Sequence, residues 1–204
     1  MRHEGVGLRA ILRVRGFRLL LGTRLVGQAG DGLLEAGLAA FVLFSPTSQP
    51  TPAKAAIAFA ILLVPYSVIG PFAGVLIDRW RRRWVLLLAN CLRAAMVGVL
   101  ALIVAGGHDD AVLALWVLAL LGVNRFVLAA LSAGLPHVVV GRYLVTGNAL
   151  APTAGTVAWM VGGVAGLLLR HAVGGGDSGA VVVLLAAVPT YLLAGGVAAR
   201  LAPD

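Results

Sequence analysis

Charged residues are scarce in this 204-residue sequence, since Asp, Glu, Lys and Arg together make up 12% of it. Hydrophobic residues make up 60%, and the mean hydropathy is +0.99. A soluble globular domain of average composition carries about 25% charged residues. The shortage of charge therefore argues against an ordinary soluble protein and indicates a chain that faces lipid.

Cysteine occurs once, as Cys91, inside an apolar run. One thiol can form neither an intrachain disulfide nor a thiolate metal cluster. The histidines lie near chain ends or loop edges without metal-ligand spacing, and no Gly-x-Ser-x-Gly motif occurs. We therefore expect no metal site, no cofactor and no enzymatic activity.

Acidic residues are also few, eight against sixteen Lys and Arg, which gives a formal net charge of +8. A balance this basic can indicate a nucleic-acid partner. The basic residues are instead spread along the chain at the ends of apolar runs, where membrane topology places them. The expected partner is a lipid bilayer and not a nucleic acid.

Six apolar runs are each long enough to cross a hydrocarbon core of about 30 Å as a helix. They cover residues 17–44, 55–77, 84–106, 111–135, 145–169 and 179–199. Loop residues separate the runs at 45–52, 78–83, 106–110, 136–142 and 174–179. The sequence predicts an all-α membrane protein with a six-helix domain over 17–199 and a cytoplasmic end at 200–204.

Residues 1–16 are basic and are expected to form a short amphipathic segment on the cytoplasmic membrane surface. In that segment Ile11, Leu12 and Val14 would face lipid. The run that follows is interrupted by Arg24, so it is a poor signal-peptide core, and we expect no cleaved segment.

The basic residues divide unequally between the two faces that six spans would create. One face, with both chain ends and the second and fourth loops, has eleven: Arg2, Arg9, Arg13, Arg15, Arg18, Arg79, Arg81, Arg82, Arg83, Arg142 and Arg200. The opposite face has Lys54 and Arg170. Because Lys and Arg resist translocation, we expect both termini in the cytoplasm of a multi-pass cell-membrane protein. Termini on one side require an even number of spans, which favours six.

The stretch GVLIDRWRRR at 74–83 ends the second run with a carboxylate beside a guanidinium cluster. It resembles the loop signature of the major facilitator superfamily, in which this cluster latches two halves of a transporter in one conformation. The matching residues are Gly74, Asp78, Arg79, Arg82 and Arg83. Arg81 stands where the signature has its second glycine. A simple positive-inside anchor with an incidental Asp78 is the alternative.

Two further stretches are similar to a drug and siderophore exporter-like branch of that superfamily: FRLLLGTRLVGQAGDGL at 17–33 and NRFVLAALSAGLPHVVVGRYLVTGNAL at 124–150. The resemblance implies proton-coupled efflux of small amphipathic molecules, with the chain as an amino-terminal six-helix half built as a 3+3 inverted repeat. A second six-helix half or a homodimer partner is then expected. A non-transporting membrane scaffold or assembly protein, or a truncated transporter without function, are the alternatives.

Four polar residues of the first run share one helical face. Arg24, Gln28, Asp31 and Glu35 are offset by 0, 4, 7 and 11 positions, which places them within roughly 40° of arc. An ionisable residue at membrane depth costs about 2.5–3.5 kcal/mol on insertion scales, so this stripe should face a bundle interior or a watery cavity.

Asp31 or Glu35 is the hypothesised proton carrier, releasing a proton as substrate binds. The resemblance supports this, because acidic residues on the first helix of such exporters often couple substrate to protons. The alternative is a static ion pair in which Arg24 reaches a carboxylate through Gln28 or water. Arg125 lies near the fourth-helix arginine of the family, which is proposed to take part in proton transfer. Arg93 is expected to snorkel or to pair with a carboxylate of a neighbouring helix.

Glycines of the fifth run are spaced for close helix packing. Gly162 and Gly166 form a small-xxx-small face that lets two helix backbones approach each other. The pattern does not distinguish a specific contact from generic packing.

Overall fold

The computed structural model describes residues 8–44, 81–107 and 110–202. Its elements there are all helices: α1 (Leu8–Ile11), α2 (Arg15–Phe44), α4 (Arg82–Ala105), α5 (Asp110–Val138), α6 (Gly141–Ala172) and α7 (Gly176–Ala198). The predicted second span at 55–77 lies outside the described residues, and so do Gly74, Asp78 and Arg79 of the loop motif.

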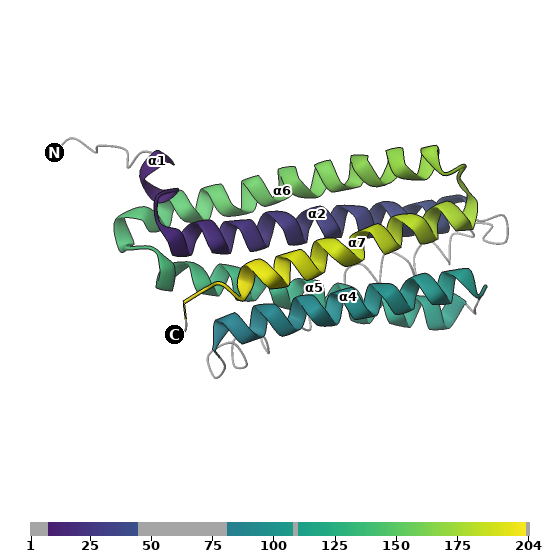
Figure 1. Ribbon diagram of the computed structural model, residues 1–204, viewed down its shortest axis with the longest axis horizontal. Helices are drawn as coiled ribbons and strands as arrows, with labels where there is room; N and C mark the ends of the chain where they lie inside the picture. The colour runs from purple at the N-terminus through teal and green to yellow at the C-terminus, as the bar shows by residue number, and fades with distance from the viewer. Residues whose placement is uncertain (1–7, 45–80, 108–109, 203–204) are drawn as a thin grey trace.

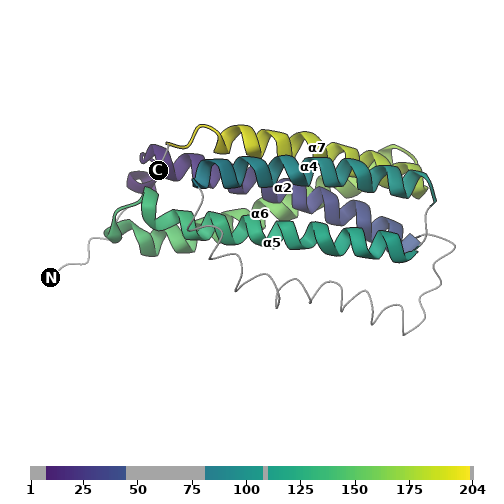
Figure 2. The ribbon, with the colours of Figure 1, turned by 90° about the horizontal axis from the view of Figure 1, so that it is seen from below.

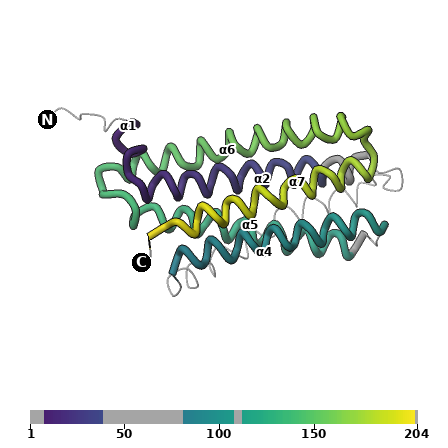
Figure 3. Tube along the Cα trace, viewed as in Figure 1, coloured from purple at the N-terminus to yellow at the C-terminus, as the bar shows by residue number. Residues whose placement is uncertain are grey.

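The five long helices run side by side along one elongated bundle (Figures 1 and 2). Helix α2 makes extensive contacts with both α6 and α7, while α4 packs against α7 and α5. The Cα trace in Figure 3 shows α2 between α6 and α7 over most of its length. Helix α2, which contains Arg24, Gln28, Asp31 and Glu35, is therefore a central element of the bundle.

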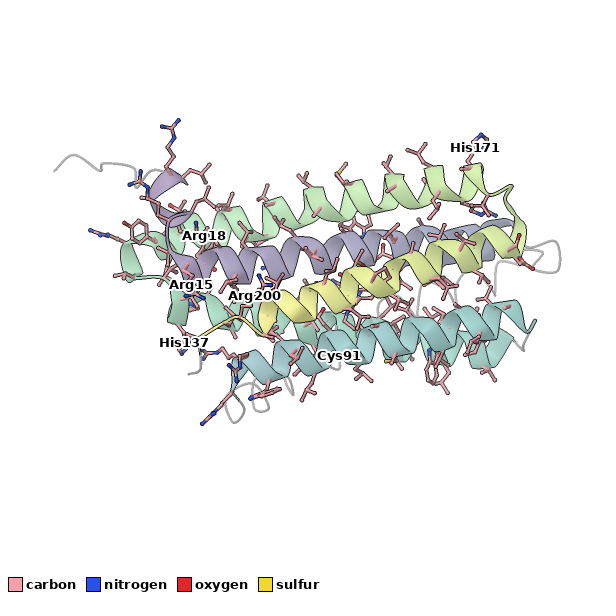
Figure 4. All side chains as sticks on the ribbon, viewed as in Figure 1. Arg15, Arg18, Cys91, His137, His171 and Arg200 are labelled. Atoms are coloured by element: carbon pink, nitrogen blue, oxygen red, sulfur yellow. The ribbon has the colours of Figure 1, made fainter. Side chains whose placement is uncertain are left out.

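The chain alternates between the two ends of the bundle. Arg15, Arg18, His137 and Arg200 lie at one end, and His171 lies at the other (Figure 4). The start of α2, the end of α5 and the end of α7 thus share one end. Successive membrane crossings produce this arrangement.

Four helices of the described residues are long and apolar enough to cross a membrane: Arg82–Ala105, Val112–Val138, Gly141–Ala172 and Gly176–Ala198. They coincide with the last four predicted runs. Helix α2 is 30 residues long and runs beside them, but its polar stripe keeps it out of this apolar set. The chain is an all-α membrane protein, while six spans and the 3+3 repeat stay predictions.

Two loops are shorter than the sequence suggested. The break expected at 136–142 is reduced to Val139 and Val140, because α5 continues through Pro136 to Val138. Pro136 removes one backbone hydrogen bond, a loss that α5 tolerates just as α6 and α7 tolerate Pro152 and Pro189. Helix α7 begins at Gly176, since glycines with φ of +99°, +74° and +67° at 174–176 complete the turn.

The expectation that Ile11 faces lipid is wrong. The turn after α1 folds this residue back against the bundle, where it is fully buried in a cluster with Phe17 and Leu135. Its side chain lies against Gly147 of α6, a position where a Cβ would leave only 3.2 Å to Ile11 Cδ1. Leu8 is the exposed apolar residue of this segment.

The buried core has two apolar clusters with a polar layer between them. One cluster includes Phe17, Leu86 and Leu131, and the other includes Leu34 and Val97. The layer between the clusters contains most of the buried polar side chains of the described residues: Arg24, Asp31, Asn90, Arg93 and Asn124. This layer is the candidate functional site, because polar groups at membrane depth are usually paired with each other or take part in function.

Candidate functional site

A buried ion pair joins α2 to α4 inside the polar layer. The Arg93 guanidinium pairs with the Asp31 carboxylate, and their side chains are only 2% and 7% exposed. Asn90 supports the arginine, because its Oδ1 accepts a hydrogen bond from Arg93 at 3.1 Å. The Asn90 amide in turn donates to the Leu86 carbonyl at 2.7 Å. The guanidinium is thus held on two sides.

Tyr191 of α7 completes this cluster. Its hydroxyl donates to Asp31 Oδ1 at 2.9 Å, and its ring centre lies 4.1 Å from the Arg93 guanidinium carbon. Three helices are therefore tied together through one carboxylate. Asp31 pairs with Arg93, as the expectation of a carboxylate partner on a neighbouring helix allowed, and not with Arg24, which the alternative of a static pair within α2 had named.

Removing the Tyr191 hydroxyl is expected to loosen this connection. Tyr191→Phe keeps the ring over Arg93 and deletes the hydrogen bond to Asp31. A hydrogen bond to a charged group contributes about 1.5–3 kcal/mol, so we expect a loss of that size in the free energy of unfolding. Denaturant titration in mixed micelles measures it, with Tyr143→Phe at the bundle surface as the matched control. Equal losses in the two variants would contradict the buried role.

A cavity of about 250 Å³ lies beside this cluster, between α2, α5 and α6. Its wall is mostly polar and draws on all three helices: Gln28, Asp31, Glu35, Asn124, Arg125, Leu128, Thr156 and Trp159. Three of the four residues in the polar stripe of α2 thus face one space, together with Arg125 of α5. The fourth, Arg24, does not line it.

Glu35 is the carboxylate with the most access to the cavity. It is half-buried, whereas Asp31 is 5% exposed and held by its pair with Arg93. The Trp159 side chain hydrogen-bonds to Glu35, and Arg125 lies within electrostatic range of it. A carboxylate placed between an indole donor, a guanidinium and an open space can exchange a proton with that space.

Arg24 lies one helical turn from the cavity, at the seam between α2 and α6. It is 8% exposed, and its Nε donates to Gln28 Oε1 at 3.2 Å. Gly155 of α6 faces the pair, and a Cβ there would overlap the Gln28 amide. The arginine therefore fixes the Gln28 side chain that lines the cavity.

Gly162 and Gly166 lie at the same seam. A Cβ on Gly162 would overlap the Ala29 backbone of α2, and one on Gly166 would come within 2.8 Å of Ala36 Cβ. Gly32 of α2 faces the backbone of α6 in the same manner. The two helices touch backbone to backbone, which brings Gln28 and Glu35 close to α6.

The described part of the loop motif lies at the opposite end of α4 from its connection to α5. Arg82 and His137 form a hydrogen bond of 2.9 Å that joins the first turn of α4 to the last turn of α5. Arg83 lies over the Trp84 ring at 5.1 Å. Neither arginine approaches the cavity wall.

Several residues of the site were absent from the sequence prediction. Asn90 has a local signal, since it precedes Arg93 by three positions and therefore shares a helix face with it. Tyr191 and Trp159 have none, because a lone aromatic in an apolar run is as compatible with lipid as with a buried partner.

The fold and the polar layer together define the class: a multi-pass membrane protein with an ionisable cluster and a cavity inside its helix bundle. Two curated relatives are similar to the chain over most of its length. They are the uncharacterized MFS-type transporter Rv0037c of Mycobacterium tuberculosis and the uncharacterized MFS-type transporter Mb0038c of Mycobacterium bovis. Each is 44% identical to it over 185 residues, which is 90% of this chain.

The similarity is thus to part of two proteins that are named as transporters of the MFS type. The names of the relatives are those of transporters and not of enzymes. The matched region is 42% of each relative, so the chain spans less than half of their length. No family model and no solved structure matches the sequence.

Proposed function

We propose that the chain is a six-helix half of a major facilitator superfamily exporter, which moves small amphipathic molecules in exchange for protons. The observation that carries this proposal is the cavity between α2, α5 and α6. There a half-buried carboxylate, Glu35, lies within electrostatic range of Arg125. Intramembrane ionisable residues that share a cavity are typical of proton and substrate pathways.

Of the two carboxylates in α2, Glu35 is the better proton carrier. Asp31 is bound by Arg93 and Tyr191, so protonating it would leave a buried guanidinium without its counter-charge. Glu35 borders the cavity and can exchange its proton without breaking a buried pair. We propose that Glu35 releases a proton as substrate binds, while Asp31 holds α2 to α4 and α7.

The membrane orientation belongs to the same proposal. Arg15, Arg18 and Arg200 share one end of the bundle (Figure 4), and this end is proposed to face the cytoplasm of a cell membrane. The Arg82–His137 hydrogen bond lies at that end too. It is placed to steady the loop motif of residues 74–83, whose proposed role is to latch the transporter in one conformation.

A second six-helix unit is part of the proposal. Among the described residues, the face of α6 that carries Val157, Met160 and Val164 is exposed. Either a further half or a second copy of the chain would complete a two-fold transporter. Cross-linking and native mass measurement in detergent test the homodimer. Detection of monomers alone would contradict it. A membrane scaffold is the alternative function, but a scaffold role would not explain the polar cavity.

Replacing the proposed proton carrier tests the function. In inverted vesicles carrying the chain, an acidic lumen, from which protons flow outward, should drive accumulation of phenyl-naphthylamine, an uncharged fluorescent amphipath. Glu35→Gln keeps the size and the hydrogen-bonding of the side chain but cannot ionise. We expect it to remove at least nine tenths of the gradient-driven flux, because a general acid–base group contributes about 10²-fold or more.

The matched control is Gln28→Glu, which moves a carboxylate one to two turns along the same face of α2. It should not restore flux when combined with Glu35→Gln, since Arg24 already engages position 28. Full gradient-driven flux in Glu35→Gln would contradict the assignment of this residue. Absence of such flux in the unmodified chain would favour the scaffold.

A further inference from the structure

One polar atom of the cavity wall has no partner in the part of the chain that the structure describes. It is the side-chain oxygen of Asn124, a residue that is 5% exposed and lines the cavity. Buried acceptors in proteins are nearly always paired, and leaving one unpaired is costly. A molecule that brings an N–H or O–H into the cavity would satisfy this oxygen.

The neighbouring acceptors of the wall are already engaged. Gln28 Oε1 accepts from Arg24, Glu35 is hydrogen-bonded by Trp159, and the Asp31 carboxylate is held by Arg93. Asn124 Oδ1 is the acceptor of the wall that has no protein partner among the described residues, so a donor on a bound molecule gains most there. Specificity for a hydrogen-bond donor follows, because a ligand without one leaves the oxygen unpaired.

The same cavity has an apolar portion. Leu128 and Trp159 both line it, and Trp159 is 38% exposed. An indole of this kind stacks with an aromatic body and prefers it to an aliphatic one. The volume of about 250 Å³ lies at the small end for ligand pockets, so the body is a small ring system.

Charge within the polar layer restricts the ligand further. Arg125 lines the cavity with the carboxylates Asp31 and Glu35, and Arg93 pairs with Asp31 beside it, so two arginines balance two carboxylates (2 − 2 = 0). The apolar run at 55–77 contains no Asp, Glu, Lys or Arg that could change this balance. A permanent cation entering the cavity would find no surplus of negative charge to compensate it, which is unfavourable at low dielectric.

We propose that the cavity binds an uncharged aromatic amphipath whose N–H or O–H donates to Asn124 Oδ1, and that it disfavours permanent organic cations. This inference rests on the proposed function, because it treats the cavity as the transport site. The two are chemically compatible.

Three probes separate the parts of this inference. Phenyl-naphthylamine has one N–H, its N-methyl derivative has the same aromatic body without it, and tetraphenylphosphonium is a permanent cation. Binding to the full 204-residue chain in nanodiscs is followed by quenching of tryptophan fluorescence, with empty nanodiscs as the baseline. We expect the N–H probe to bind about fivefold to tenfold more tightly than its N-methyl derivative, and the cation to bind most weakly.

Asn124→Ala should remove the preference for the N–H probe while leaving the affinity of the N-methyl derivative nearly unchanged. Asn148→Ala, at an exposed asparagine of α6, is the matched control and should keep the preference. The comparison of the probes on the unmodified chain needs no variant, so it holds even where Asn124→Ala folds poorly.

Equal affinities of the two amines, tightest binding of the cation, or binding of neither amine would overturn the inference. If the preference for the N–H probe persists in Asn124→Ala, the size of the methyl group explains that preference. The inference is then overturned as well. Glu35→Gln separates this inference from the proposed function. Selective binding without proton-driven flux in the unmodified chain contradicts only the exporter, and flux without selectivity contradicts only the role of Asn124.

Discussion

Replacing Asp31 by asparagine is expected to destabilise the bundle by about 3–5 kcal/mol, because it leaves the Arg93 guanidinium buried without its counter-charge. Asparagine retains an oxygen for the Tyr191 hydroxyl, so the lost charge and not the lost shape dominates the effect. The free energy of unfolding in mixed micelles measures this cost. Glu35→Gln, at the half-buried carboxylate of the same helix face, is the matched control and should cost less than about 1 kcal/mol.

The double variant Asp31→Asn with Arg93→Gln isolates the charge. Removing both members of a buried pair is often nearly neutral, so the double variant should recover most of the loss. An Asp31→Asn chain within about 1 kcal/mol of the unmodified chain would show that the pair does not hold the helices together. A double variant as unstable as the single one would assign the loss to hydrogen bonding or packing instead.

Gly162→Ala is expected to have the second largest effect. The new Cβ would collide with backbone atoms of Ala29, including the carbonyl carbon at 2.8 Å, and backbone cannot move aside as a flexible side chain can. Overpacking of a core typically costs 1–3 kcal/mol, and we expect about 3 kcal/mol at this seam. Separation of α2 from α6 should also weaken binding of phenyl-naphthylamine, because Gln28 and Trp159 line the cavity from the two sides of the seam.

Gly98→Ala in α4 is the control for the change of residue type. A Cβ at Gly98 meets no atom within 4 Å, so the higher helix propensity of alanine should stabilise the chain by up to about 1 kcal/mol. Opposite signs for the two substitutions are the expected result. A Gly162→Ala chain as stable as the unmodified one would mean that the backbones of α2 and α6 are not in contact.

The helices and the polar face of α2 could be predicted because both depend on local pattern. An apolar run of about 20 residues needs a helix to satisfy its backbone in lipid, whatever its neighbours are. The offsets from Arg24 to Glu35 fix one helix face in the same way. Pro136 misled the loop prediction, because a helix packed in a bundle can continue through a proline when neighbouring groups satisfy the freed carbonyl, as α6 and α7 continue through Pro152 and Pro189.

The partners within the site could not be predicted in this way. Asp31 is 62 positions from Arg93 and 160 from Tyr191, so their contact depends on which helices pack together and at what rotation. Arg24 was the nearer candidate in sequence, yet its Nε donates to the Gln28 amide. The unpaired oxygen of Asn124 is a property of its surroundings in three dimensions and leaves no trace in a single sequence.

The central claim is that a carboxyl of α2 gives up a proton when a molecule enters the cavity, and counting those protons tests it most directly. The enthalpy of phenyl-naphthylamine binding to the chain, measured at one pH in two buffers of different ionisation enthalpy, reports the number of protons released. Proton release is expected from the unmodified chain and none from Glu35→Gln. Equal binding enthalpies in both buffers for the unmodified chain would contradict it.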